Sequence, residues 1–233
     1  MNKLVRFVAA AVLFVVPMSA ANNLEPDDAF FKSYHDQVKS VFKELYKPGV
    51  RARMTVEPSF SVEYAVAVKQ AGENFTVISV TAENQLWRFE VLKQMKAGQI
   101  SASDDKGTDT TAAEIKKLEA SLPKNPNEVK VDRCEVPLDA ALAGRIIAAW
   151  RKMLAGVAAA PYDGGLDGTF YHFSAPVDGK ELAGQTWSPS EDSNTGRLVT
   201  IAETARSYCQ KKNPSDIATL QKQVDGLARM LPP

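Results

Sequence analysis

The stretch VRARMTVEPSFSVEYAVAV, residues 50–68, decides the fold class, because its apolar residues recur at every second position. A period of two is typical of β-strands that bury one face. The apolar positions are Val50, Ala52, Met54 and Val56 before the turn at Pro58 and Ser59, and Phe60, Val62, Tyr64, Val66 and Val68 after it. The two runs and the turn between them predict an antiparallel pair of strands.

Two more runs extend this pair toward the C-terminus, over residues 75–81 and from Leu86 to Leu92. The short links between the four runs predict a four-stranded antiparallel meander. On the N-terminal side, the spacing of apolar residues predicts an amphipathic helix that opens at Pro26-Asp27-Asp28 and ends at Pro48-Gly49. His35 is expected on the polar face of this helix.

The second half of the chain follows a polar stretch, residues 93–109, which predicts a surface loop or a boundary between two lobes. Its predicted elements are a short helix from Thr111, a strand over 128–136, a long amphipathic helix over 138–157, strands over 169–174 and 182–187, and helices over 195–211 and from 215. The Asp178-Gly179 pair marks a hairpin turn between the last two strands. The sequence therefore predicts an α+β fold, in which an antiparallel sheet (a four-stranded meander plus a second-half hairpin) packs with amphipathic helices.

Residues 1–21 have the pattern of a cleavable export signal. A basic start precedes an apolar run over residues 8–16, and Ser19 and Ala21 precede a cut before Asn22. The run is shorter than the ~20 residues that a membrane-spanning helix needs, which disfavours the alternative of an uncleaved anchor. We therefore expect a periplasmic or secreted protein.

The charge balance excludes no small ligand but gives no basic surface for nucleic acid. The chain of 233 residues carries 28 basic and 28 acidic side chains, whereas nucleic-acid binding proteins cluster an excess of Lys and Arg. No other long apolar stretch predicts a membrane span after signal cleavage. Residues 22–233 form the predicted mature domain, either as one unit or as two lobes, 22–108 and 109–233.

Cys134 and Cys209 are the only cysteines, and in an oxidising compartment an even pair predicts a disulfide. A metal pair and a reactive thiol are the alternatives, but neither cysteine has supporting ligands nearby in the sequence. The bond would tie the strand before the long helix to the C-terminal helices.

No motif for catalysis, metal binding or a cofactor is recognisable. Only two histidines are present, and the chain lacks a Gly-x-Ser-x-Gly elbow, a His-Glu-x-x-His motif and a glycine-rich phosphate loop. We therefore predict no catalytic residue, no metal site and no cofactor. Two carboxylates that converge only in space stay open as an enzymatic alternative.

The second-half hairpin and its exit form the predicted binding surface, because aromatic residues beside loops are typical anchors of protein interfaces. The candidate residues are Tyr162, Tyr171, His172, Trp187, Ser188 and Pro189. The alternative for Trp187 is a place in the hydrophobic core beneath Trp150, and the alternative for His172 is a packed or hydrogen-bonded strand residue.

The C-terminal part of the chain resembles uncharacterised periplasmic proteins of bacteria. The resemblance lies in Cys134, the Trp150 helix, the segments 167–173 and 184–189, and the helix that ends at Cys209, and it implies no activity or site residue. The general profile, with an export signal, a small α+β body, one disulfide and no catalytic motif, is also similar to periplasmic immunity proteins and lysozyme inhibitors.

That second similarity implies a binding role. We therefore expect a non-catalytic periplasmic binding protein, such as an inhibitor or immunity protein for a hydrolytic effector or enzyme, whose partner is another protein. Two alternatives stay open at this point. One is a cell-envelope hydrolase that uses a carboxylate pair, and the other is an assembly or structural factor of the envelope.

Overall fold

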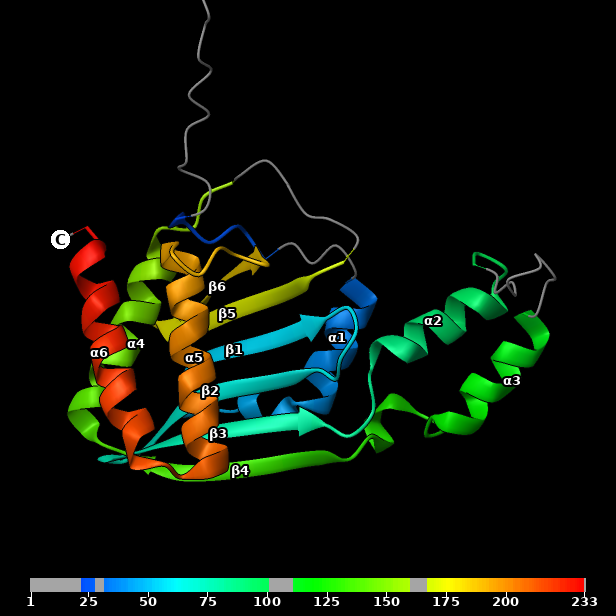
Figure 1. Ribbon diagram of the computed structural model, residues 1–233, viewed down its shortest axis with the longest axis horizontal. Coiled ribbons are helices and arrows are strands. Elements are labelled where there is room, and N and C mark those ends of the chain that lie inside the picture. The colour runs from blue at the N-terminus through cyan, green and yellow to red at the C-terminus, as the bar shows by residue number, and fades with distance from the viewer. Residues whose placement is uncertain (1–21, 28–31, 101–110, 160–166, 233) are drawn as a thin grey trace, which may run out of the picture.

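A central six-stranded sheet organises the protein (Figure 1). The computed structural model describes residues 22–27, 32–100, 111–159 and 167–232. The elements are α1 (Lys32–Val41), the 3-10 helix η2 (Lys43–Tyr46), β1 (Val50–Pro58), β2 (Tyr64–Ala71), β3 (Asn74–Ala82), α2 (Trp87–Lys96), α3 (Thr111–Ser121), the 3-10 helix η3 (Pro126–Glu128), β4 (Val131–Leu138), α4 (Ala140–Ala155), β5 (Thr169–Val177), β6 (Lys180–Trp187), α5 (Asn194–Lys211) and α6 (Pro214–Met230).

The strand order is β4-β3-β2-β1-β5-β6, and every neighbouring pair is antiparallel. The meander β1-β2-β3 lies beside the hairpin β5-β6 because β5 pairs with the free edge of β1. Strand β4 pairs with β3 at the other end of the sheet. The predicted α+β class with an antiparallel sheet is confirmed, and the sheet draws strands from both sides of residue 109.

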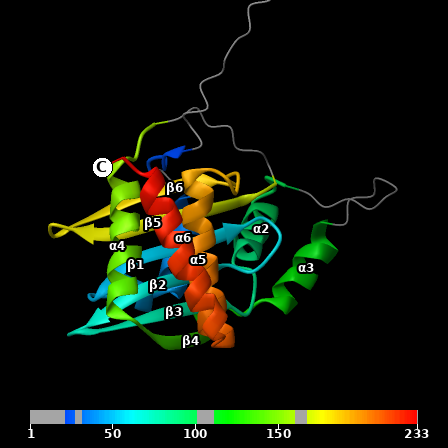
Figure 2. The same ribbon diagram turned by 60° about the vertical axis from the view of Figure 1, so that its left-hand side comes forward.

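Helices cover both faces of the sheet. Helices α4, α5 and α6 lie on one face, and α1 lies on the opposite face (Figures 1 and 2). A large apolar core, which includes Met54, Leu142, Trp150, Phe173 and Ile201, fills the space under α4, α5 and α6. A second, smaller apolar core under α1 includes Val38, Phe42, Ala65 and Ile78. Consequently β1 is buried along its whole length except at Arg51.

The predicted strand from Leu86 to Leu92 is wrong, because this segment begins helix α2. The buried carboxylate of Glu63 accepts hydrogen bonds from the backbone N–H groups of Leu86 (2.7 Å) and Trp87 (2.9 Å). Amide groups at the first turn of a helix have no partner within the helix, and a carboxylate there satisfies them. The contact with Glu63, from the link between β1 and β2, therefore favours a helix over a strand in this segment.

The predicted N-terminal helix also ends earlier than expected, at Val41, and the 3-10 helix η2 follows it. Helix α1 begins at Lys32, and Phe30 and Phe31 of the predicted apolar stripe lie outside the described residues. Asp27 belongs to an extended segment that precedes the helix. Glu25 in this segment pairs with Gln185 of β6 through two backbone hydrogen bonds of 2.8 Å, which carries Asp27 under the edge of the sheet.

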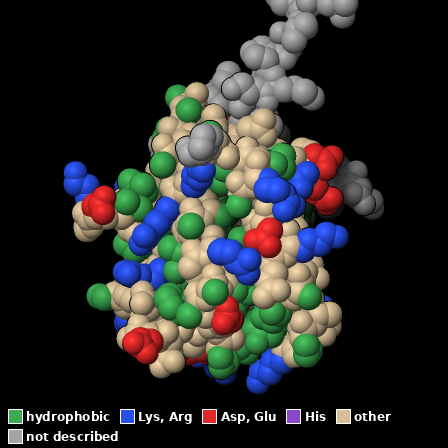
Figure 3. Space-filling model, turned by 90° about the vertical axis from the view of Figure 1, so that its left-hand side faces the viewer, with side chains coloured by type: hydrophobic (Ala, Val, Ile, Leu, Met, Phe, Trp, Pro, Cys, Tyr) green, Lys and Arg blue, Asp and Glu red, His purple; other side chains and the backbone are tan. Residues whose placement is uncertain are grey.

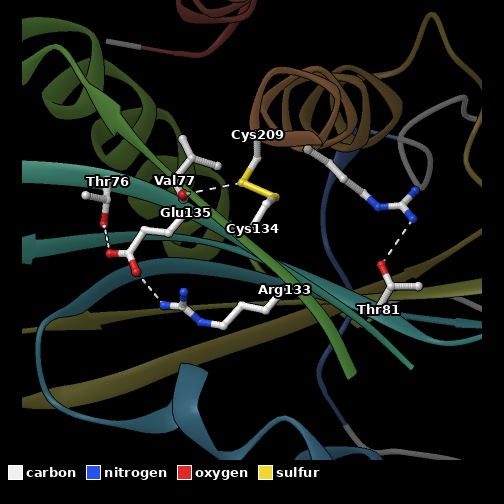
Figure 4. The surroundings of a disulfide bond; sticks show 8 residues. Thr76, Val77, Thr81, Arg133, Cys134, Glu135 and Cys209 are labelled. Carbon is white, nitrogen blue, oxygen red and sulfur yellow. Dashed lines mark hydrogen bonds and ion pairs between the residues drawn. A yellow bond between two sulfur atoms is a disulfide. The ribbon is translucent and has the colours of Figure 1, made fainter. Parts of the chain in front are cut away.

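The predicted disulfide is confirmed. Cys134 of β4 is bonded to Cys209 of α5, 75 residues further along the chain (Figure 4). Cys209 is completely buried in the large core. The bond therefore fixes α5 to the edge of the sheet.

On the side seen in Figure 3, basic and acidic side chains are interspersed and neither sign gathers into one patch, in agreement with the balanced charge of the chain. No helix in the described part of the chain has the length and apolar character that a membrane crossing requires.

We expect removal of the disulfide to lower the free energy of unfolding by about 4 kcal/mol, because the cross-link closes a long loop and restricts the unfolded chain. Urea unfolding of the Cys134→Ala/Cys209→Ala variant would measure the loss. Reductant should bring the wild-type protein to a similar stability and leave the variant unchanged. Equal stability of the oxidised protein and the variant would contradict this expectation.

Candidate functional site

The only two histidines of the chain meet under α1. His35 comes from α1 and His172 from β5, and their ring centroids lie 4.1 Å apart. Both side chains are buried, with exposed fractions of 3 % and 6 %. His35 was expected on the polar face of its helix, and the structure buries this side chain. The face of α1 that carries His35 packs on a sheet whose own side chains are polar at this point.

Two carboxylates enclose the pair of rings. Glu57 lies 2.5 Å from His35 Nδ1 and 3.3 Å from His172 Nε2. Asp27 lies 2.8 Å from His172 Nδ1 and 3.9 Å from His35 Nε2. Each carboxylate thus faces both rings, and each ring has one carboxylate at either end. We call Asp27, His35, Glu57 and His172 the His–carboxylate cluster.

Strand pairing explains how these residues converge. Alternate residues of a strand point to opposite faces, so Met54 and Val56 of β1 enter the large core while Arg53, Thr55 and Glu57 point toward α1. Thr55 is the partner of His172 in the pairing of β1 with β5, which places His172 beside Glu57. The segment that contains Asp27 and helix α1 then close the cluster from below.

The cluster contains ring nitrogens without a hydrogen bond. Among the described residues, neither His35 Nε2 nor His172 Nε2 has a hydrogen-bond partner, although both atoms are buried. His172 Nε2 is close to Glu57 but is not aligned with it for a hydrogen bond. Burial of an unpaired polar atom costs about 1–3 kcal/mol, so the cluster as it stands has unused binding capacity.

The same residues have the arrangement of a metal site. One donor atom from each of Asp27, His35 and His172 can be chosen so that all three lie within 4.8 Å of one another. Imidazole nitrogens and carboxylate oxygens are typical ligands of zinc and of other divalent transition metals. The expectation of no metal site therefore has a structural alternative.

Without a metal, the members of the cluster shift one another's pKa values. Burial alone would raise the pKa of Glu57, but the charge of His172, together with the charge and hydrogen bond of His35, holds it at about 2. Burial alone would lower the pKa of His172, but Glu57 and Asp27 raise it to about 9. Burial also opposes the ionisation of Asp27, yet His172 keeps the pKa of this carboxyl below its usual range. The two carboxylates therefore favour the protonated form of the His172 ring.

A cavity of about 250 Å³ opens beside the cluster. Its wall contains Asp27, His35 and His172, whereas Glu57 is not among its described lining residues. The remaining wall is largely polar and includes Lys39, Tyr46, Arg53, Thr55, Ser174 and Glu181. The cavity therefore gives a small molecule access to three members of the cluster.

The predicted surface residues fall on two faces of the sheet. Tyr171, Ser188 and Pro189 line an open groove of about 570 Å³ beside α5. His172 points to the opposite face and joins the cluster. Trp187 is on that opposite face too, where its ring packs edge-on against Phe170 at 4.6 Å. Tyr162 lies outside the described residues.

Asp27, His35 and Glu57 were not predicted as site residues. The available signal was in β1, where Arg53, Thr55 and Glu57 give an otherwise apolar strand one charged face. No protein family, curated protein or solved structure significantly matches this chain. The resemblance of the C-terminal part of the chain to uncharacterised periplasmic proteins therefore stays a prediction.

For the protein stripped of metal by a chelator, we expect stability to decline on both sides of a plateau between about pH 4.5 and 6.5. Glu57 has a lower pKa folded (about 2) than unfolded (4.5), so its contribution is present above pH 4.5 and is lost as the pH falls toward 2. His172 has a higher pKa folded (about 9) than unfolded (6.5), so its contribution is lost as the pH rises from 6.5 to 9.

Urea unfolding across this pH range would measure both limbs, each with a slope of up to about 1.4 kcal/mol per pH unit. The His172→Gln variant is the matched control because it removes the titrating ring and keeps a polar side chain. Its alkaline limb should be flatter than that of the wild type. An unchanged alkaline limb would show that His172 does not hold the proton.

Proposed function

We propose that this protein binds one divalent transition-metal ion at the His–carboxylate cluster and presents it to a small molecule in the adjoining cavity. The proposed ligands are His35 Nε2, His172 Nδ1 and the Asp27 carboxylate. The observation that carries this proposal is the convergence of both histidines of the chain, buried, on two carboxylates, with an unpartnered ring nitrogen, His35 Nε2, facing Asp27.

The position of Glu57 selects these ligand atoms. Glu57 faces His35 Nδ1 and His172 Nε2, so the other nitrogen of each ring is directed toward Asp27. Histidine ligands of metals commonly use their second nitrogen to contact a carboxylate, which fixes the tautomer and the ring orientation. Glu57 would serve both rings in this way. Its absence from the described cavity wall agrees with an outer position.

The donor set fits zinc well and iron(II) also. Zinc bonds to nitrogen and oxygen are about 2.0–2.2 Å long, so ligand atoms of one ion lie no more than about 4.4 Å apart. The distances from Asp27 to His172 Nδ1 (2.8 Å) and to His35 Nε2 (3.9 Å) lie below this maximum. Three protein ligands leave a further position open, and such an open position lets an ion activate water or polarise a bound ligand.

We expect the titration of the metal-stripped protein with Zn²⁺ to give one bound ion per chain by isothermal calorimetry. The His35→Ala and His172→Ala variants should lose at least 100-fold in affinity because each removes a ligand. Glu57→Gln should lose about 10–100-fold because it removes an outer-sphere partner of both rings. Thermal unfolding of each variant without metal would show that it is folded.

The matched control is Glu203→Gln. Glu203 accepts a hydrogen bond from Tyr64 and lines the groove beside α5, on the other face of the sheet. Its removal should leave zinc affinity unchanged. Stoichiometry near zero, or equal affinity in the wild type and the folded histidine variants, would refute the metal site.

The groove beside α5 favours a second candidate, a protein-binding role. Tyr171, Ser188 and Pro189 line this groove, and its described wall contains three acidic residues and no Lys or Arg. Oδ2 of Asp216 is buried without a hydrogen-bond partner in the described part of the chain. We propose that an exposed basic segment of a protein partner is the occupant, because its charge complements this wall.

Affinity capture from the envelope of the producing cell would test the groove. The Glu191→Arg/Asp216→Arg variant should lose a partner that the wild type captures, and the partner should present a basic segment. Glu119→Arg, a charge reversal on the remote helix α3, is the control and should retain the partner. Equal capture by the wild type and the groove variant would rule out this use of the groove.

We further propose that the protein acts outside the cytosol, in the periplasm or after secretion. This proposal depends on the sequence pattern of residues 1–21, which lie outside the described residues. The Cys134–Cys209 bond is compatible with that location. The proposed metal site does not depend on it.

A further inference from the structure

We infer that the cavity beside the cluster binds a small carboxylic acid, with Arg53 as the anchor of its carboxylate. This inference deepens the proposed function, since the other end of the acid would lie at the metal. The evidence that Arg53 binds the carboxylate is independent of the metal site and comes from the contacts of Arg53 and Glu181.

Arg53 is a buried and preorganised cation. Its exposed fraction is 7 %, and its guanidinium lies 3.5 Å from the centre of the Tyr46 ring. Nη1 donates a hydrogen bond of 2.8 Å to the Leu45 carbonyl. These contacts hold the planar group in one orientation, which reduces the entropy lost when it binds a carboxylate.

Glu181 shows where a carboxylate is accepted. Nη2 of Arg53 donates a hydrogen bond to Oε1 of Glu181, and both residues line the cavity. The side chain of Glu181 is 55 % exposed, whereas that of Arg53 is 8 % exposed. Glu181 therefore reaches Arg53 from the solvent side, and a free carboxylate that takes its place keeps the buried guanidinium paired.

The position of Arg53 on β1 connects the anchor to the cluster. Arg53 precedes Thr55 by two residues on the same face of the strand, a separation of about 7 Å, and Thr55 is the pairing partner of His172. A short acid whose carboxylate is bound to Arg53 can therefore extend to the side of the cavity that His35, His172 and Asp27 form. The cavity volume of about 250 Å³ suits a molecule of a few carbon atoms.

Charge also favours an acid. The wall contains Arg53 and Lys39 as cations and Asp27 and Glu181 as carboxylates. Binding of a divalent cation by Asp27 and the two histidines would add two positive charges. Once Glu181 has moved away from Arg53, the net charge of the cavity would be positive. An anion is then the complementary ligand.

Succinate, acetate and inorganic phosphate, each titrated into protein with and without one equivalent of Zn²⁺, would test the inference. Succinate should bind the zinc-loaded wild type more tightly than phosphate does. Arg53→Gln should weaken succinate binding at least 10-fold, and Arg53→Lys should weaken it less. Glu181→Gln should strengthen it several-fold, because it removes the internal competitor, and thermal unfolding would show that this variant is folded.

Zinc affinity should be the same in the wild type and in these variants, and Arg133→Gln, on the remote strand β4, should change neither affinity. Succinate binding that is weaker than phosphate binding, unaffected by Arg53→Gln, or weakened by Glu181→Gln would overturn the inference. The two proposals fail separately. Arg53-dependent binding of succinate without any zinc binding would refute only the metal site, and zinc binding without succinate binding would refute only the acid pocket.

Discussion

The rest of the structure depends on the burial of a charged strand face. β1 lies in the middle of the sheet with helices on both sides, and Arg53, Thr55 and Glu57 form its second face. An ionised side chain that loses its water without a partner is costly, so buried charges in proteins are paired. The fold therefore has to bring partners to β1 from other elements. It brings His172 from β5, Glu181 from β6 and His35 from α1. Asp27, from the segment before α1, then pairs with the two histidines.

This requirement divides the space under α1 into two parts. Below β2 and β3 the sheet presents small and aliphatic residues such as Ala65 and Ile78, and α1 meets them with Val38. Below β1 and β5 the sheet presents polar residues, and the same helix meets them with His35. A single short helix thus covers an apolar core and a polar cluster. Glu25 pairs with β6 and so holds the 22–27 segment on the sheet. This segment, which is not helical at Asp27, supplies Asp27 as the fourth member of the cluster.

Local patterns predicted those elements whose conformation is decided locally. The Asp178-Gly179 turn adopts positive φ values of 49° and 77°, as the pair predicts for a hairpin. The strand predicted from Leu86 to Leu92 was wrong because Glu63, which lies outside this segment, accepts the hydrogen bonds of the first helical turn. The cluster was missed for a related reason. Alternation in β1 shows that two faces differ, but the sequence does not say that α1 covers the polar one.

A purely structural role explains the cluster less well than a metal does. Buried ion pairs often contribute no more stability than apolar residues of the same size, so a closed network of four charged or polar groups is not needed to hold α1 on the sheet. The network is also uneven, since His172 Nδ1 has a good bond to Asp27 while His35 Nε2 stays 3.9 Å from the same carboxylate. Each of these contacts needs its own proton on a ring nitrogen. A divalent cation between them would serve both rings and Asp27 together, and Glu57 would still satisfy the opposite ends of the rings.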